Sequence, residues 1–156
     1  MTDVTVILPT FNERENIRPL IERVLAALAG RQVQVLVVDD DSPDGTWQVV
    51  QELAAGDRRV VLERRLNARG LTSAIWHGIQ RAAGDIVVWM DCDLSMPPED
   101  IPRLLEALEA GAADIAIGGR YCAGGADVGH ALVGQVFSRA INLFAGLFLG
   151  FDISDY

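Results

Sequence analysis

Short apolar runs rich in Val and Ile alternate along the chain with longer segments in which apolar residues recur at helical spacing. This alternation is typical of repeated β–α units around a parallel sheet. Five strands are predicted, at Val4–Leu8, Val33–Val38, Val60–Glu63, Ile86–Met90 and Asp114–Ile117. The second and fourth are almost continuously apolar, as strands covered on both faces are. The pattern therefore predicts an α/β fold, with a mostly parallel sheet flanked by helices.

Helical periods fill the segments between these strands. Four helices are predicted, at Ile17–Ala29, Thr46–Ala54, Leu71–Ala83 and Pro98–Ala110. A further helix, Leu132–Leu149, follows a glycine-rich loop and carries an apolar stripe along one side. We expect this stripe to pack on the rest of the protein, or alternatively to lie in a membrane interface.

Some residues beside the strands and helices are expected to be structural. Trp47 and Trp89 are predicted to fill the core, and the Arg64-Arg65 pair after the third strand is predicted to be a solvated strand end. His77 is expected to be a packed or surface histidine and not a catalytic base.

The composition limits the number of domains and the classes of partner. A chain of 156 residues, half of them apolar, can bury one sizeable core, so a single domain over residues 1–156 is expected. A net charge of −9 disfavours nucleic acid as a partner. Cys92 and Cys122 stand far apart, which suits a reducing cytoplasm. We expect no secretory signal, and no apolar run is long enough to cross a bilayer.

Polar residues follow four of the five predicted strands, at the edge of a parallel sheet where ligands bind. They are Pro9–Glu13 after the first strand, Asp39–Gly45 after the second, Asp91–Asp93 after the fourth and Gly118–Tyr121 after the fifth. Each segment alone is compatible with ordinary turn or capping chemistry. Their common position at strand ends predicts one shared site.

Asp91 and Asp93 give this shared site a candidate metal centre. Residues two apart in an extended segment point the same way, so the two carboxylates repel each other unless a cation lies between them. Hard oxygen ligands suit Mg²⁺ or Mn²⁺, with water and the oxygens of a diphosphate completing the coordination. Ser95 is a third, weaker candidate oxygen ligand.

In combination, the motifs resemble the family 2 glycosyltransferases of GT-A fold and, within them, the dolichol-phosphate mannose synthases. The matching segments are Leu8–Asn16, Val38–Thr46, Gly70-Leu71, Asp91–Ser95, Pro97–Glu99, Gly119–Tyr121 and Ser138-Arg139. The resemblance implies a GT-A, Rossmann-like nucleotide-sugar-binding domain. Phe11 stands where the family usually has Tyr, and Ser95 where many members have Gln.

Residue by residue, the resemblance implies a donor site. It assigns the nucleoside to Pro9, Phe11, Glu13, Val38 and Asp40, and the diphosphate and metal to Asp91, Cys92 and Asp93, with Arg120 near the sugar phosphate. Asp93, Arg120 and Arg139 are the expected catalytic residues, the two arginines gripping the lipid phosphate.

The implied activity is metal-assisted transfer of mannose from GDP-mannose to a polyprenyl or dolichyl phosphate, with inversion, at the cytoplasmic surface of a membrane. Two alternatives stay open. One is a glucosyltransferase that uses UDP-glucose and the same lipid, and the other is a nucleotide-sugar-binding module without catalysis. Because family members continue past the point where this chain stops, it is expected to be truncated at its C-terminus.

Overall fold

The computed structural model describes residues 3–111 and 113–119. The chain divides into two compact units, Met1–Arg103 and Leu104–Tyr156. The first unit contains one sheet of four parallel strands, in the order β3-β2-β1-β4. The strands are β1 (Val4–Thr10), β2 (Val33–Asp39), β3 (Val60–Arg64) and β4 (Ile86–Trp89). The mostly parallel α/β sheet expected from the sequence is therefore confirmed.

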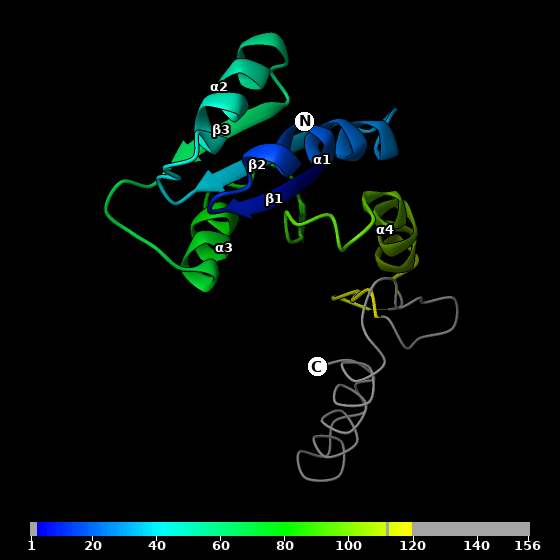
Figure 1. The fold of residues 1–156 in the computed structure, drawn as a ribbon. Coiled ribbons are helices and arrows are strands. Elements are labelled where there is room, and N and C mark those ends of the chain that lie inside the picture. Colours follow the sequence, from blue (N-terminus) through cyan, green and yellow to red (C-terminus); the bar gives the residue numbers. More distant parts are fainter. Residues whose placement is uncertain (1–2, 112, 120–156) are drawn as a thin grey trace, which may run out of the picture. The chain divides into compact units, whose positions relative to one another are not determined.

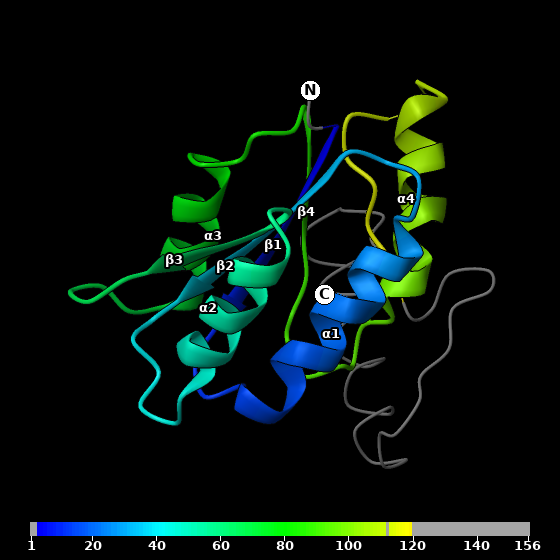
Figure 2. The same ribbon diagram turned by 90° about the horizontal axis from the view of Figure 1, so that it is seen from above.

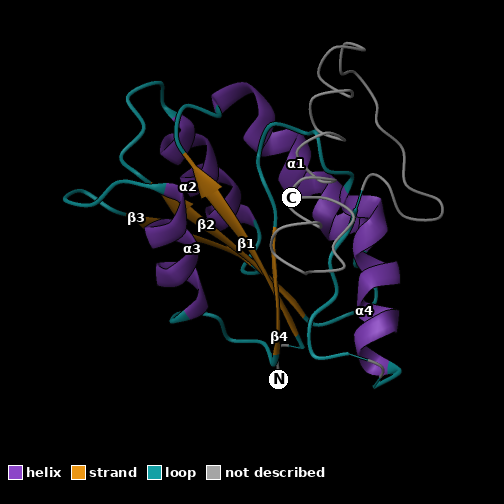
Figure 3. Cartoon of the chain, turned by 90° about the horizontal axis from the view of Figure 1, so that it is seen from below, coloured by secondary structure: helices purple, strands orange, loops and turns teal. Residues whose placement is uncertain are grey.

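Helices cover both faces of this sheet. They are α1 (Arg14–Ala27), α2 (Thr46–Gly56) and α3 (Leu71–Ile79). Helices α1 and α2 lie side by side on one face, while α3 lies on the other against β1 and β2 (Figure 1). Figure 2 views the sheet from the side of α1 and α2, and Figure 3 views it from the opposite side. A short 3₁₀ turn, η1 (Pro98–Asp100), leads into α4 (Ile101–Glu109).

The central strands form the core because they have neighbours on both edges and helices on both faces. Every residue of β1 is buried, and β2 is buried except at Gln34. On the α3 face, Ile7, Leu36 and Val38 pack with Ala74. Gly78 lets α3 approach β1 closely, since a Cβ there would lie 2.6 Å from Cγ2 of Ile7.

The third helix ends earlier than predicted, at Ile79 instead of Ala83. Thr5 on β1 explains this early end, because its Oγ1 accepts hydrogen bonds from the backbone N–H groups of Ala83 (3.1 Å) and Gly84 (3.0 Å). The N–H groups of residues 83 and 84 are thereby bound to the side chain of a β1 residue and cannot form the hydrogen bonds that would continue the helix.

The predicted fifth strand, Asp114–Ile117, is wrong. These residues form no strand, and the side chains of Ile115 and Ile117 are 76% and 73% exposed. A strand exists only where its backbone groups pair with a neighbour, and an apolar sequence alone does not provide one.

The expectation that β4 is covered on both faces is also wrong. Val87 and Trp89 are exposed along one face, with 48% of Trp89 accessible, so Trp89 does not fill the core. Within the described residues β4 pairs with β1 alone, and its outer side chains lack the neighbours that bury β2.

The predicted helix Leu132–Leu149 lies outside the described residues, and the single domain expected over residues 1–156 stays a prediction. Over the part of the chain that the structure describes, none of the helices has the length and apolar character needed to cross a membrane.

Candidate functional site

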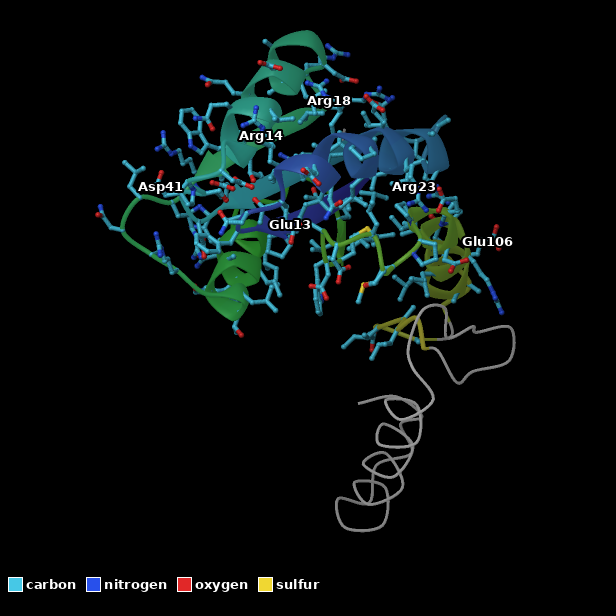
Figure 4. All side chains as sticks on the ribbon, viewed as in Figure 1. Glu13, Arg14, Arg18, Arg23, Asp41 and Glu106 are labelled. Carbon is cyan, nitrogen blue, oxygen red and sulfur yellow. The ribbon has the colours of Figure 1, made fainter. Side chains whose placement is uncertain are left out.

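The carboxyl ends of neighbouring strands bring three of the predicted polar segments together. Strand β1 lies between β2 and β4, so the segments that follow these three strands share one edge of the sheet. Figure 4 shows the labelled side chains of Glu13, Arg14 and Asp41 at this edge. The sequence-based expectation of a common position is confirmed for these segments, and Gly118-Gly119 belongs to the other unit.

A latch of hydrogen bonds joins the β1–α1 loop to the β2–α2 loop. Three successive backbone N–H groups at the start of α1 donate to three side chains that lie between the end of β2 and the start of α2. The pairs are Asn12 with Oγ of Ser42 (3.0 Å), Glu13 with Oγ1 of Thr46 (2.9 Å) and Arg14 with Oδ2 of Asp44 (3.1 Å). The latch satisfies donors at the start of α1 that have no partner inside that helix.

Asp39 anchors this latch from within the core. Its carboxylate is fully buried and accepts hydrogen bonds from Oγ1 of Thr10 (2.9 Å), the backbone N–H of Ser42 (2.9 Å) and Oγ of Ser42 (2.6 Å). Sequence reasoning missed this role. The available signal was the position of Asp39 at the last residue of a buried strand, where a carboxylate needs several donors.

Asp40, a predicted nucleoside ligand, forms a buried ion pair with Arg65. Oδ1 of Asp40 accepts a hydrogen bond from Nε of Arg65 (2.7 Å), and Oδ2 accepts one from the backbone N–H of Gly70 (2.8 Å). Arg65 also donates to Oγ of Ser73 (3.0 Å) and to the Gly70 carbonyl (3.2 Å). The pair thus holds the β3–α3 loop against the end of β2.

The prediction that Arg65 is a solvated strand end is therefore wrong. Its backbone N–H donates to the carbonyl of Asp39 (2.8 Å), which continues the ladder between β2 and β3 for one more residue. This continuation carries the side chain inward, beside Asp40, where only 8% of Arg65 is exposed.

Two aromatic rings near this edge carry arginines over their faces. Phe11 is 44% exposed, and Cζ of Arg69 lies 5.0 Å from the centre of its ring. Cζ of Arg64 lies 3.8 Å from the centre of the Trp47 ring, and Arg64 also pairs with Asp41. Trp47 is only half-buried beneath Arg64, so the prediction that it fills the core is wrong.

Asp91 and Asp93 lie just after β4 and influence each other electrostatically. Burial, and then the negative charge of Asp93, raise the pKa of Asp91. Hydrogen bonds from the Ser95 side chain and backbone lower the pKa of Asp93, and the Ser95 N–H lies 2.9 Å from Oδ1 of Asp93. Leu94 bends the segment in a left-handed conformation, with φ 64°.

This pair fits a divalent cation that keeps part of its coordination sphere open. Among residues 3–111 and 113–119, no three His, Cys, Asp or Glu side chains are arranged to hold a metal. Two carboxylates on one short segment, with Ser95 beside them, supply the hard oxygen ligands that Mg²⁺ and Mn²⁺ prefer. A cation bound by this pair would need further oxygen ligands from outside the protein.

Four of the predicted donor-binding residues are buried, namely Pro9, Val38, Asp40 and Cys92. Sγ of Cys92 donates to the carbonyl of Pro9 (3.3 Å), and burial raises the pKa of its thiol, which stays neutral. Val38 packs in the core. Cys92 and Val38 could therefore contact a donor only through their backbone groups.

The remaining predicted site residues fall into two groups. Glu13 is partly exposed, and its Oε2 accepts a hydrogen bond from Nδ2 of Asn16 (2.9 Å). Arg120 and Arg139 lie outside the described residues.

Comparison with known proteins identifies the family. The model of glycosyl transferase family 2 matches residues 5–152. The chain belongs to this family. A dolichol-phosphate mannosyltransferase from Pyrococcus furiosus is 51% identical over 122 residues, which is 78% of this chain and 34% of that protein. A polyprenol monophosphomannose synthase from Mycolicibacterium smegmatis is 42% identical over 154 residues, which is 96% of this chain and 57% of that protein.

This family 2 chain also resembles a solved structure, a mannosyltransferase from Pyrobaculum calidifontis in complex with GDP-Man and Mn²⁺. The TM-score is 0.58 at 30% identity, over 71% of this chain and 32% of that one. The structural neighbours are GT-A glycosyltransferases, so the expected fold class is confirmed. The chain spans about a third of the length of the Pyrococcus relative and just over half of the length of the Mycolicibacterium relative.

Proposed function

We propose that this chain is the nucleotide-sugar-binding part of an enzyme that transfers mannose from GDP-mannose to a polyprenyl phosphate. The observation that carries the proposal is the Asp91–Asp93 pair beside the latched β1–α1 and β2–α2 loops, in a chain similar to two enzymes named for this transfer. The mannosyltransferase bound to GDP-Man and Mn²⁺ supports the donor and the metal.

In the proposed donor site, Asp91 and Asp93 hold Mg²⁺ or Mn²⁺, which when bound supplies positive charge to the departing diphosphate. Phe11 offers an exposed ring on which the nucleoside can rest. Glu13 offers a carboxylate at the start of α1, and Pro9, Val38 and Cys92 contribute backbone groups. Asp40, held by Arg65, fixes the β3–α3 loop against the end of β2 beside this site.

The acceptor chemistry needs positioning more than proton transfer. A lipid monophosphate has a second pKa of about 6 and is mostly dianionic at neutral pH, so it requires no general base. Direct attack of its oxygen on the anomeric carbon inverts that centre. Arg120 and Arg139 are proposed to grip the phosphate, since the planar guanidinium matches phosphate oxygens. Because the acceptor is a lipid, we place the reaction at a membrane surface, on its cytoplasmic side.

Calorimetric titration of the 156-residue chain with GDP-mannose, UDP-glucose and GDP, each with and without Mn²⁺, tests the donor site. We expect GDP-mannose and GDP to bind tightly only with Mn²⁺, and UDP-glucose to bind more weakly. Stronger binding of UDP-glucose would indicate that the enzyme uses a glucosyl donor instead of GDP-mannose. Equal binding of GDP in excess EDTA would show that donor binding does not require the metal.

A further inference from the structure

The β3–α3 loop places a cation over the exposed ring of Phe11. Cζ of Arg69 lies 5.0 Å from the ring centre, within the range of a cation–π contact. Both side chains are exposed. The contact therefore lies at the surface, on the ring that the proposed function gives to the nucleoside.

Arg69 differs from the two arginines at the end of β3, because each of those has an acidic partner. Arg64 pairs with Asp41, and Arg65 pairs with Asp40. In the described part of the chain, Arg69 forms no ion pair and no side-chain hydrogen bond, and its guanidinium lies over the Phe11 ring. Its donors and its planar face remain available to a ligand.

The backbone next to Arg69 is fixed although its side chain is exposed. Gly70 donates its N–H to Oδ2 of Asp40 (2.8 Å) and accepts a hydrogen bond from Nη2 of Arg65 (3.2 Å). Gly70 also has φ 121°, a conformation that side chains rarely adopt. The loop thus holds the base of the Arg69 side chain in place while the guanidinium lies at the surface.

The spacing defines what this arrangement can hold. A planar base stacked between the ring and the guanidinium needs about 7 Å between them, because each stacked contact takes roughly 3.5 Å. The observed 5.0 Å is too short for an inserted base. The guanidinium must therefore withdraw by about 2 Å, which a long, exposed arginine side chain can do without moving the loop.

From this geometry, we infer that Arg69 is a nucleobase-binding residue, which leaves the Phe11 ring and closes over a base resting on it. The inference rests on the proposed function, because that function supplies the nucleotide. Phe11 and Arg69 then contact opposite faces of the base. The contact with Phe11 keeps the guanidinium within about 2 Å of the position that this role requires.

Calorimetry with guanosine and with GDP, in the presence of Mn²⁺, tests the inference on the wild type, Arg69→Ala and Arg69→Lys. We expect Arg69→Ala to weaken both ligands by the same factor, roughly five- to thirty-fold. Arg69→Lys should recover only part of the affinity, since an ammonium lacks the planar face. Arg58→Ala, which removes an exposed arginine before β3, is the matched control and should bind like the wild type.

Thermal melts separate binding from folding. Because Arg69 is exposed and unpaired, its variants should melt at the wild-type temperature. A loss confined to GDP and abolished by high salt would assign Arg69 to the phosphates and overturn the inference. Unchanged affinity in Arg69→Ala would overturn it while leaving the proposed function intact. Failure of the wild type to bind any of the nucleotides would overturn both.

Discussion

Three consecutive aspartates at the end of β2 have different environments. Asp39 is buried and accepts hydrogen bonds from Thr10 and Ser42. Asp40 is buried and paired with Arg65, whereas Asp41 is partly exposed and adopts a left-handed conformation with φ 56°. The same side chain therefore serves as a core acceptor, as one partner of a buried ion pair and as a surface ligand for Arg64.

Replacing Arg65 tests the buried pair. Arg65→Met leaves the Asp40 carboxylate buried without its cation, so we expect a loss of about 3–5 kcal/mol in the free energy of unfolding. Urea denaturation measures this loss. Arg59→Met, which breaks the more exposed pair with Asp57, is the control and should cost less than about 1 kcal/mol. Similar small losses for both variants would contradict the role assigned to Arg65.

Replacing Asp93 tests the proposed metal site. Asp93→Asn removes a ligand and also one cause of the raised pKa of Asp91, which should fall toward its ordinary value. We expect Mn²⁺-dependent binding of GDP to weaken strongly while the melting temperature stays nearly constant, since Asp93 is exposed. Calorimetry and thermal denaturation measure the two effects. A large drop in melting temperature would mean that Asp93 is mainly structural.

At the scale of helices and loops, Asp44 links the start of α1 to the start of α2. Its Oδ1 accepts hydrogen bonds from the N–H (2.9 Å) and Oγ1 (2.7 Å) of Thr46, and its Oδ2 accepts the N–H of Arg14. We expect Asp44→Ala to lower the free energy of unfolding by about 1–2 kcal/mol at pH 7, as loss of a helix cap does. Urea titration measures the change.

The effect of Asp44→Ala should depend on pH. Burial raises the pKa of Asp44, but the hydrogen bonds from Thr46 and Arg14 outweigh burial and lower it overall. A lowered folded-state pKa gives stability that is complete above the unfolded value of about 3.9 and is lost as the pH falls through the folded value. The difference between wild type and variant should therefore be constant above about pH 5 and shrink below pH 4. A difference that grows in acid would contradict this assignment.

The close approach of α3 to β1 predicts a steric effect at Gly78. A Cβ at this position would lie 2.6 Å from Cγ2 of Ile7, so Gly78→Ala should destabilise the protein by about 1–3 kcal/mol through overpacking. Gly56→Ala is the matched helix control, because nothing lies within 4 Å of its Cβ. It should be neutral or stabilising by up to about 1 kcal/mol. Thermal denaturation of both variants distinguishes packing from helix propensity.

At the scale of the whole molecule, the four strands of the sheet and the polar loops that follow them could be predicted from the sequence, because both leave a local pattern. Buried strands such as β2 are continuously apolar, and parallel strands bring their carboxyl ends to one edge. The role of Arg65 could not be predicted, since it depends on one further ladder bond to Asp39. The exposure of Trp89 and the missing strand at Asp114–Ile117 depend on neighbours that apolar patterning does not specify.

Membrane association is a further prediction for the whole chain. If Arg139 and the apolar stripe of the predicted helix Leu132–Leu149 approach the lipid, Arg139→Ala and the double change Phe144→Ser/Phe148→Ser should each weaken binding to anionic liposomes containing polyprenyl phosphate. Co-sedimentation measures the bound fraction. An unchanged cooperative melt of each variant is the control for folding. Wild-type lipid binding by both folded variants would leave the helix with a packing role.

The latch between the first two loops makes strict demands on some of its positions and none on another. Ser42, Asp44 and Thr46 are constrained by backbone groups of residues 12–14, whatever nucleotide the site accepts. Pro43 stands exposed among them and takes no part in the latch. The residue at position 43 can therefore change without rebuilding the hydrogen bonds that hold the two loops together.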